Sequence, residues 1–209
     1  MSITVDGQEK KIGLALSGGG FRAAAFHLGV FRELQDRNLL SKLDLLTCVS
    51  GGSIAGGFLA AHWGAADVLD NLEEYLSTKS IAVASIIGGL LSPFESRLEK
   101  LAETYDRDLF GGRTLSALRG GPRIYFNSTN LATGNMFFFV AGRILADGHI
   151  ADELMGEHES GTVSASDYPI SRAVAASSAF PPVFPPLRLN ADLYPNALTE
   201  YVTLTDGGV

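Results

Sequence analysis

Apolar residues alternate along this chain between short continuous runs and stretches with helical spacing. IGLAL at 12–16 and LDLLTCV at 43–49 are short apolar runs next to turn residues, which is typical of buried strands. Between them, residues 22–37 carry apolar side chains such as Phe26 and Leu34 at the spacing of one helix face. This succession predicts strands that pair in a sheet, with helices packed on it.

The same two patterns continue to the end of the chain. Helices are predicted over 53–62, 66–79, 94–109 and 170–178, and strands over 123–131, 136–142 and 201–205. The alternation predicts the α/β class, with three layers and a mostly parallel central sheet flanked by helices. Neither a repeat nor a charged linker divides the chain, so we expect residues 1–209 to form a single domain.

Composition narrows the class of protein. Apolar residues make up 46% of the 209 residues and charged residues 19%, which suits a globular domain with a full core. The net charge of −7 without a Lys/Arg cluster argues against nucleic-acid partners. Cys48 is the single cysteine, so an internal disulfide is excluded.

The apolar runs are too short to cross a bilayer, for which about 18 residues are needed. The N-terminal MSITVDGQEKK has no apolar signal core. We therefore expect a cytoplasmic protein that at most visits a membrane surface. The segment 80–94, SIAVASIIGGLLSPF, is the candidate for a lid or a surface contact, although a buried helix has the same pattern.

Ser50 lies between a predicted buried strand and a predicted helix, in the sequence Cys48-Val49-Ser50-Gly51-Gly52. A tight strand-to-helix turn exposes a serine as a nucleophile and requires small neighbours. Cys48 stands where glycine is usual, and it is also small. Ser50 could instead only cap the helix. Ser53 is a second candidate nucleophile, but it falls inside the predicted helix.

SGGGFR at 17–22 follows the first strand and opens the first long helix. Three glycines free the backbone to turn several N–H groups toward one point, where they bind an anion. One use is a dinucleotide site, since Gly18, Gly20 and Ala23 loosely fit the Rossmann fingerprint. The other is an oxyanion hole. The next strand ends in Cys48-Val49-Ser50 rather than in an acidic residue, which favours the oxyanion hole.

Asp206 ends the last predicted strand and precedes two glycines. A carboxylate in a water-poor pocket could act as a base, but Asp-Gly is also a common surface turn. No histidine follows Asp206, so the usual order of serine, acid and histidine is absent. We expect His27 to be packed in the core and His149 and His158 to be exposed. The spacing of metal ligands is also absent, so no metal is expected.

Four separated features together resemble the patatin-like phospholipase family. These are SGGGFR at 17–22, VSGGS at 49–53, DGG at 206–208 and the segment 173–186, AVAASSAFPPVFPP, which is similar to the family's Ala-Ser-x-Ala…Pro segment. Residues 127–134 resemble the family's strand and turn.

The resemblance implies a Ser–Asp dyad in which Ser50 attacks an ester carbonyl and Asp206 takes and returns the proton. It implies an oxyanion hole formed by the N–H groups of Gly18, Gly19 and Gly20. Arg22 matches a basic position that either holds a lipid phosphate or anchors the loop. The family needs no cofactor for this chemistry and releases fatty acids from glycerolipids, so a phospholipid or other glycerolipid is the expected substrate.

Two departures from the family pattern bear on function. Ala23 stands where the family often has glycine, and the sequence ends three residues after Asp206. We therefore expect a truncated domain, or one that another polypeptide completes, with Asp206 held less firmly than inside a longer chain. Besides a lipid acyl hydrolase, the sequence leaves open a non-catalytic lipid-binding protein and a dinucleotide-dependent enzyme.

Overall fold

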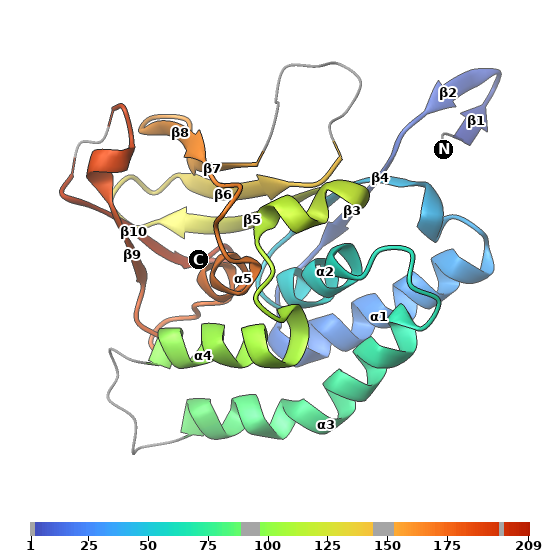
Figure 1. Cartoon of the computed structure of the whole chain (residues 1–209), viewed down its shortest axis with the longest axis horizontal. Helices are drawn as coiled ribbons and strands as arrows, with labels where there is room; N and C mark the ends of the chain where they lie inside the picture. The colour runs from blue at the N-terminus through green and yellow to red at the C-terminus, as the bar shows by residue number, and fades with distance from the viewer. Residues whose placement is uncertain (1–2, 89–96, 144–152, 197–198) are drawn as a thin grey trace.

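The computed structural model of the protein describes residues 3–88, 97–143, 153–196 and 199–209. At the N-terminus, strands β1 (Ile3–Val5) and β2 (Gln8–Lys10) pair as a hairpin that projects from the body of the molecule (Figure 1). The sequence pattern did not predict this hairpin, because strands of three residues are too short to show a period.

A mixed sheet of eight strands forms the body. The strands are β3 (Ile12–Leu16), β4 (Leu43–Cys48), β5 (Arg123–Asn130), β6 (Met136–Ala141), β7 (Leu154–Glu157), β8 (Gly161–Ser164), β9 (Leu187–Asn190) and β10 (Tyr201–Asp206). They follow the order β3-β4-β5-β6-β7-β8, while β10 pairs with both β5 and β9. The five longer strands lie where the sequence predicts them.

The α/β class and the helix-flanked central sheet are confirmed, but parallel pairing is confined to one half of the sheet. β3, β4 and β5 are parallel, and the other described pairs of this sheet are antiparallel. Parallel neighbours need a crossover helix, whereas β5 and β6, like β7 and β8, are joined by short turns. The parallel half is the one that carries Ser50.

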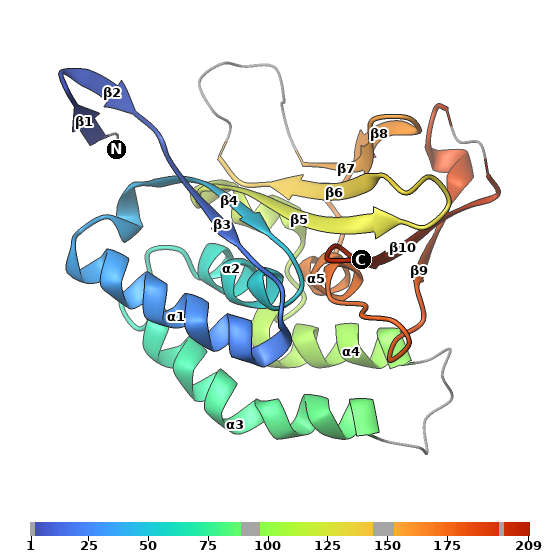
Figure 2. The same ribbon diagram turned by 180° about the vertical axis from the view of Figure 1, so that it is seen from behind.

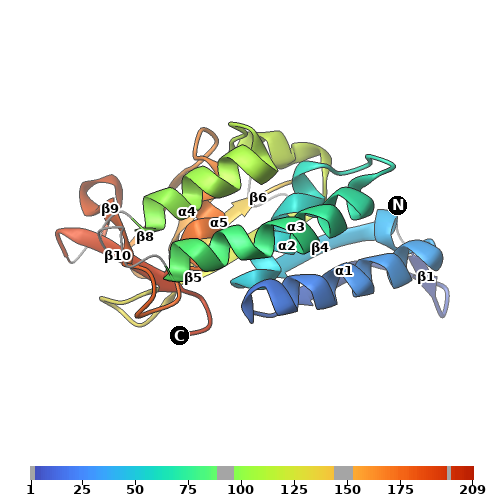
Figure 3. The same ribbon diagram turned by 90° about the horizontal axis from the view of Figure 1, so that it is seen from below.

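The helices form two layers on one face of the sheet. They are α1 (Gly20–Asp36), α2 (Gly51–Ala61), α3 (Val68–Gly88), α4 (Arg97–Tyr105) and α5 (Ile170–Ser177). The inner helices α2 and α5 pack on the sheet and on each other, and α1, α3 and α4 cover them (Figure 3). Figure 2 shows α1 below the edge strand β3. In the described residues the three layers are thus one sheet and two helix layers.

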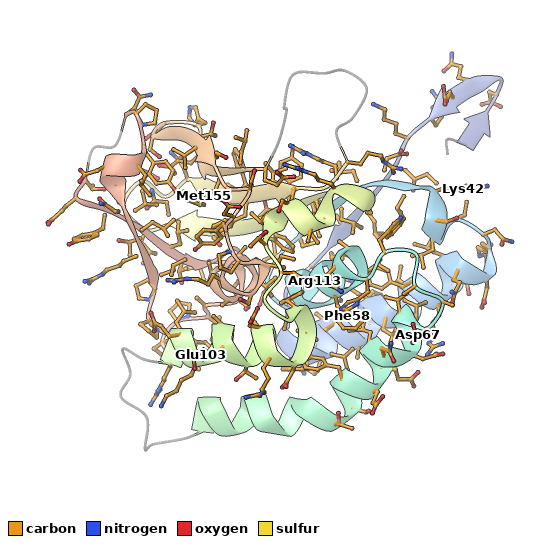
Figure 4. The ribbon with its side chains drawn as sticks, viewed as in Figure 1. Lys42, Phe58, Asp67, Glu103, Arg113 and Met155 are labelled. Carbon is orange, nitrogen blue, oxygen red and sulfur yellow. The ribbon has the colours of Figure 1, made fainter. Side chains whose placement is uncertain are left out.

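This one-sided arrangement follows from chain connectivity. The connections from β3 to β4, through α1, and from β4 to β5, which begins with α2, move in the same direction across the sheet. Because such crossovers are right-handed, α1 and α2 lie on the same face of the sheet. On the opposite face Gly13 and Ala15 are exposed. The inner helix α2 is buried along nearly its whole length, and Arg113 closes its far end by donating to the Ala61 carbonyl at 2.5 Å (Figure 4).

The described residues also form three short helical turns: η1 (Leu40–Lys42), η4 (Leu115–Gly120) and η5 (Ala191–Leu193). A π-helical turn, η3 (Asp106–Phe110), follows α4. The segment predicted as one helix over 94–109 therefore contains an α-helix and then a π-helical turn. α3 extends beyond the predicted 66–79 to Gly88. The candidate lid at 80–94 lies outside the residues whose side chains the structure describes.

The register of β5 brings two distant strand ends together. Along one edge of β5, Cys48 of β4 pairs with Phe126, and Asp206 of β10 pairs with Ser128. β4 and β10 run toward each other along this edge, because β4 is parallel to β5 and β10 is antiparallel to it. Their ends therefore meet beside Asn127, and both Ser50 and Asp206 lie at this meeting point.

No described helix is long and apolar enough to cross a membrane.

Candidate active site

Ser50 occupies a strained turn between β4 and α2. Its φ of 53° and ψ of −118° fall in a region that a non-glycine residue rarely adopts, and such strain concentrates at functional sites. Its side chain makes no capping bond with α2, so the helix-cap alternative is wrong. Ser53 lies inside α2 with no exposed surface, whereas Ser50 is 9% exposed and lines a cavity. Of these two serines, Ser50 is the one that lines the cavity.

The small residues around Ser50 are required by close packing. A Cβ at Gly51 would collide with the carbonyl of Gly20, and one at Gly52 would collide with the carbonyl of Leu16. A Cβ at Gly56 would lie 2.6 Å from the sulfur of Cys48. Cys48 is therefore tolerated before the turn because α2 presents a glycine to it.

Asp206 is firmly held, contrary to the expectation from its place near the end of the chain. It is 4% exposed, its N–H donates to the carbonyl of Ala179 at 3.2 Å, and its Oδ1 accepts from the N–H of Gly208 at 2.8 Å. Gly207 passes so close to the Asn127 carbonyl that a Cβ there would collide with it. Pairing of β10 with β5 and β9 immobilises this end of the chain.

The end of α5 connects the turn of Ser50 with the loop of Asp206. The carbonyl of Ser177 accepts from the N–H of Ser50 at 3.1 Å and from the N–H of Gly207 at 3.4 Å. The Ser177 hydroxyl donates to the Asn127 carbonyl at 2.6 Å and lies 2.8 Å from the hydroxyl of Ser53. The Ser50 N–H also reaches this hydroxyl at 3.2 Å. Ser177 is thus a junction of three segments that are far apart in the sequence.

Ser50 and Asp206 line the same cavity, of about 620 Å³, without a hydrogen bond between them. The glycine loop, Gly18 to Gly20, forms one part of its wall, and Arg22 is exposed at this wall. Its remaining lining is largely apolar, contributed by Phe21, Ile54, Tyr105, Phe180, Val183 and Phe184. Another cavity, of about 410 Å³ between α4 and α5, contains none of the predicted site residues.

The glycine loop lies directly against the serine turn. Gly19 and Gly20 have positive φ values of 133° and 61°, which only glycine adopts easily. A Cβ at Gly18 would lie 3.2 Å from the Cβ of Ser50. Within the described parts of the chain, the N–H groups of Gly18 and Gly19 have no hydrogen-bond acceptor. They are therefore available to an anionic oxygen in the cavity.

Tyr105, which the sequence did not indicate, also belongs to the cavity. It ends α4, is 2% exposed, and lines the cavity together with Ser178. Burial raises the pKa of Tyr105 to about 12, the Ser178 side chain opposes this rise, and the nearby Asp206 adds to it. The phenol is thus neutral near pH 7. Only tertiary packing could reveal it, since in the sequence it is an ordinary apolar position of a helix.

The described histidines take no part in the cavity lining. His27 is buried as predicted, and its Nε2 lies 3.0 Å from the carbonyl of Ser17. His158 is exposed as predicted, whereas His149 lies outside the described residues. Among the residues between 3 and 209 that are described, no group of three or more His, Cys, Asp or Glu side chains could hold a metal ion.

Several solved structures are similar to this fold, and two of them illustrate the likeness. One is human GIVD cytosolic phospholipase A2 in complex with methyl γ-linolenyl fluorophosphonate, with a TM-score of 0.58 and 17% identity over 94% of this chain and 34% of that one. The other is VipD from Legionella pneumophila, with a TM-score of 0.55 and 16% identity over 100% of this chain and 48% of that one. The chain therefore spans about a third and about half of their respective lengths.

Comparison of the sequence with curated proteins gives no significant match. The sequence profile of the family described as patatin-like phospholipase, however, matches residues 14–209. That range contains the glycine loop, the strained serine turn and the aspartate loop. The chain belongs to the patatin-like phospholipase family.

Proposed function

We propose that the protein is a lipid acyl hydrolase of the phospholipase A or lysophospholipase type, with Ser50 as nucleophile and Asp206 as base. The observation that supports this best is the strained Ser50, which shares one cavity with Asp206 and with free backbone N–H groups. Family membership supports the same reaction class. Neither residue requires a metal or a cofactor for this chemistry.

In the proposed reaction, Ser50 Oγ forms a bond to the ester carbonyl carbon, its proton passes to Asp206, and the carbonyl electron pair moves to the oxygen. Collapse of this intermediate expels the glycerol oxygen, which takes the proton from Asp206. Water then attacks the acyl-enzyme, Asp206 accepts its proton, and the fatty acid leaves as Ser50 is reprotonated. Ser50 and Asp206 are not hydrogen-bonded in this structure, and we expect their contact to tighten with substrate bound.

The N–H groups of Gly18, Gly19 and Gly20 would stabilise the negative oxygen in both halves of this reaction. Donors fixed before the reaction need no reorganisation when the charge develops, and each is worth roughly 10²–10³ in rate. The N-terminus of α1 begins in this loop, and its dipole adds positive potential there.

A fatty-acyl chain is the substrate group that fits the lining of the cavity. Burial of each methylene contributes about 0.8 kcal/mol, so a long chain gains much from contact with Phe21, Ile54, Val183 and Phe184. Phe180 at the same cavity is 56% exposed. We infer that the substrate enters past Phe180, from a lipid aggregate or a membrane surface.

Hydrolysis of phospholipid vesicles, resolved by mass spectrometry, tests the proposed function. Ser50→Ala and Asp206→Asn should each lower fatty-acid release by more than about 10⁴-fold, because each removes half of the dyad. Ser53→Ala is the comparison variant and should lower activity far less, because Ser53 contacts the site only through the Ser177 hydroxyl. A fluorophosphonate probe should label Ser50. Labelling at another residue, or full activity in Ser50→Ala, would disprove the assignment.

Arg22 is proposed to bind the lipid phosphate. Its side chain is exposed at the cavity and makes no hydrogen bond or ion pair with the residues that the structure describes, so it does not anchor the loop. Arg22→Gln should raise KM for an anionic phospholipid by about tenfold, equivalent to one charge-assisted contact, and leave KM for a neutral ester unchanged. An equal change for both substrates would indicate a structural role.

A lipid-binding protein without turnover is the second candidate, favoured by the lack of a hydrogen bond between Ser50 and Asp206. Such a protein would bind vesicles and release no fatty acid. The vesicle experiment separates the two functions, since binding and product are measured in the same sample. The dinucleotide alternative predicts heat on titration with dinucleotides. We expect none, because β4 ends at Cys48 and leads into Ser50 rather than into an acidic residue.

A further inference from the structure

His27 is a buried titratable residue that the proposed reaction does not use. It lies on α1, is 4% exposed and does not line the cavity of Ser50. Its Nε2 is 3.0 Å from the carbonyl oxygen of Ser17. A carbonyl can only accept, so Nε2 carries the hydrogen and donates it. Because Nε2 already carries this hydrogen, it has no free lone pair to accept a proton. A general-base role for this nitrogen is therefore excluded.

The acceptor belongs to the peptide group that precedes the glycine loop. The carbonyl of Ser17 and the N–H of Gly18 are parts of one planar trans peptide, and in such a peptide they point in opposite directions. The bond from His27 holds the carbonyl toward α1. The same bond therefore keeps the N–H of Gly18 pointing away from His27.

Gly18 itself lies against the serine turn. A Cβ at Gly18 would be 3.2 Å from the Cβ of Ser50 and 3.6 Å from a methyl group of Val49. Its N–H has no acceptor among the described residues. The direction of this N–H thus decides whether Gly18 contributes to an oxyanion hole beside Ser50.

The loop has little else to fix that direction. Gly18, Gly19 and Gly20 follow one another, and glycine populates both signs of φ about equally. Rotation of the 17–18 peptide, which would turn the N–H away, changes φ of Gly18, and glycine tolerates either sign of φ. An oxyanion donor accelerates a reaction only if it is oriented before charge develops. Hydrogen bonding to the carbonyl also polarises the peptide and strengthens its N–H as a donor.

We propose that His27 is a positioning residue for the oxyanion hole, which it orients by holding the Ser17–Gly18 peptide. This inference rests on the proposed function of Ser50 and the glycine loop. It assigns His27 no contact with substrate. Its loss should therefore weaken stabilisation of the transition state while leaving substrate binding unchanged.

The chain offers a matched control in His62. Its Nε2 also lies 3.0 Å from a backbone carbonyl, that of Leu109, and its ring packs on Phe58. It stands at the far end of α2 from Ser50, about 18 Å away along the helix axis. Substitution of His62 removes the same kind of bond without affecting the glycine loop.

The test compares His27→Phe, His27→Gln and His62→Phe with the wild type on a soluble ester. His27→Phe should lower kcat by about 10- to 100-fold, somewhat less than loss of a whole donor, with KM within about twofold. Its affinity for an alkyl trifluoromethyl ketone, which forms a negative tetrahedral adduct with a reactive serine, should fall by the same factor. His27→Gln keeps an N–H donor at similar reach and should retain most activity. His62→Phe should match the wild type.

A second measurement does not depend on activity. The amide resonance of Gly18 in ¹H–¹⁵N spectra should shift in His27→Phe and stay in place in His27→Gln and His62→Phe. Equal losses in both His27 variants, or an unchanged kcat and Gly18 resonance in His27→Phe, would overturn the proposal. If the wild type releases no fatty acid and Ser50 is not labelled, the proposed function fails, while the Gly18 resonance still decides the role of His27.

Discussion

Glycines at the Ser50 turn are required by contact with neighbouring backbone rather than by flexibility. Gly51 lies against the carbonyl of Gly20, so the serine turn and the glycine loop touch at this point without a side chain between them. This contact keeps the Gly18–Gly20 loop beside the turn that carries Ser50. Gly29, in the middle of α1, has no neighbour within 4 Å of an added Cβ and no positive φ.

Alanine substitutions should therefore have opposite effects at these two glycines. Gly51→Ala should separate the loop from the turn, and we expect it to abolish measurable ester hydrolysis and to lower the melting temperature. Gly29→Ala should raise the free energy of unfolding by about 0.5–1 kcal/mol, because alanine loses less backbone entropy in a helix. Activity assays and thermal melts of both variants check this. Full activity in Gly51→Ala would show that the contact is unimportant.

Among the elements, the end of α5 has the most connections to the site. Its Ser177 carbonyl accepts from the N–H groups of Ser50 and Gly207, and the next residues bind Asp206 through the carbonyl of Ala179. The spacing of the two proposed catalytic residues is thus set by a helix end that contains neither of them.

Ser177→Ala should disturb this spacing. Removal of a fully buried hydroxyl with three polar neighbours should cost about 1–3 kcal/mol of stability and lower kcat more than it changes KM. Ser171→Ala is the matched control, a buried serine at the start of the same helix. A double-mutant cycle with Ser53→Ala should give a coupling energy above about 0.5 kcal/mol, and additive effects would contradict a shared network.

For the whole molecule, buried tyrosines limit stability at high pH. Burial raises the pKa of Tyr105 to about 12 and that of Tyr168 to about 12, and it raises the pKa values of Tyr75 and Tyr194 as well. The folded protein therefore holds these protons more tightly than the unfolded chain, in which tyrosine titrates near 10. This contribution to stability is complete below pH 10 and is lost as the pH rises toward 12.

Denaturant unfolding measured between pH 8 and 12 should show this loss, with a constant free energy of unfolding below pH 10 and a decline above it. Tyr168→Phe should flatten the decline, because one buried group no longer ionises on unfolding. The variant lies outside the cavity of Ser50, so the effect can be separated from catalysis. An unchanged slope would show that Tyr168 is accessible to solvent in the folded protein.

Much of the fold could be predicted from single segments. Apolar runs located β3, β4, β5, β6 and β10, and the predicted helices include α1, α2 and α5. The pairing of the antiparallel half and the one-sided helix layers could not be predicted, because they depend on which strands become neighbours. β7, β8 and β9 were missed because strands of four residues give too short a pattern.

The candidate site divides in the same way. Ser50, Asp206 and the three glycines could be named as candidates because each stands at a strand end beside small residues, and the resemblance to a family then favoured a role in catalysis for them. Ser177, Tyr105 and the bond from His27 could not be found, because their roles depend on neighbours distant in the sequence. His27 was predicted to be a packed residue, which is correct, but its partner at Ser17 became visible only in the structure.

The sequence by itself determined the element types and the local turns, since hydrophobic period and glycine content act over a few residues. Tertiary structure decided that β4 and β10 meet end to end along β5, that α5 joins them and that the cavity beside them is apolar. The physical reason is that the register of hydrogen bonds between strands fixes these distances. Register depends on how whole faces are buried together, and no segment encodes it alone.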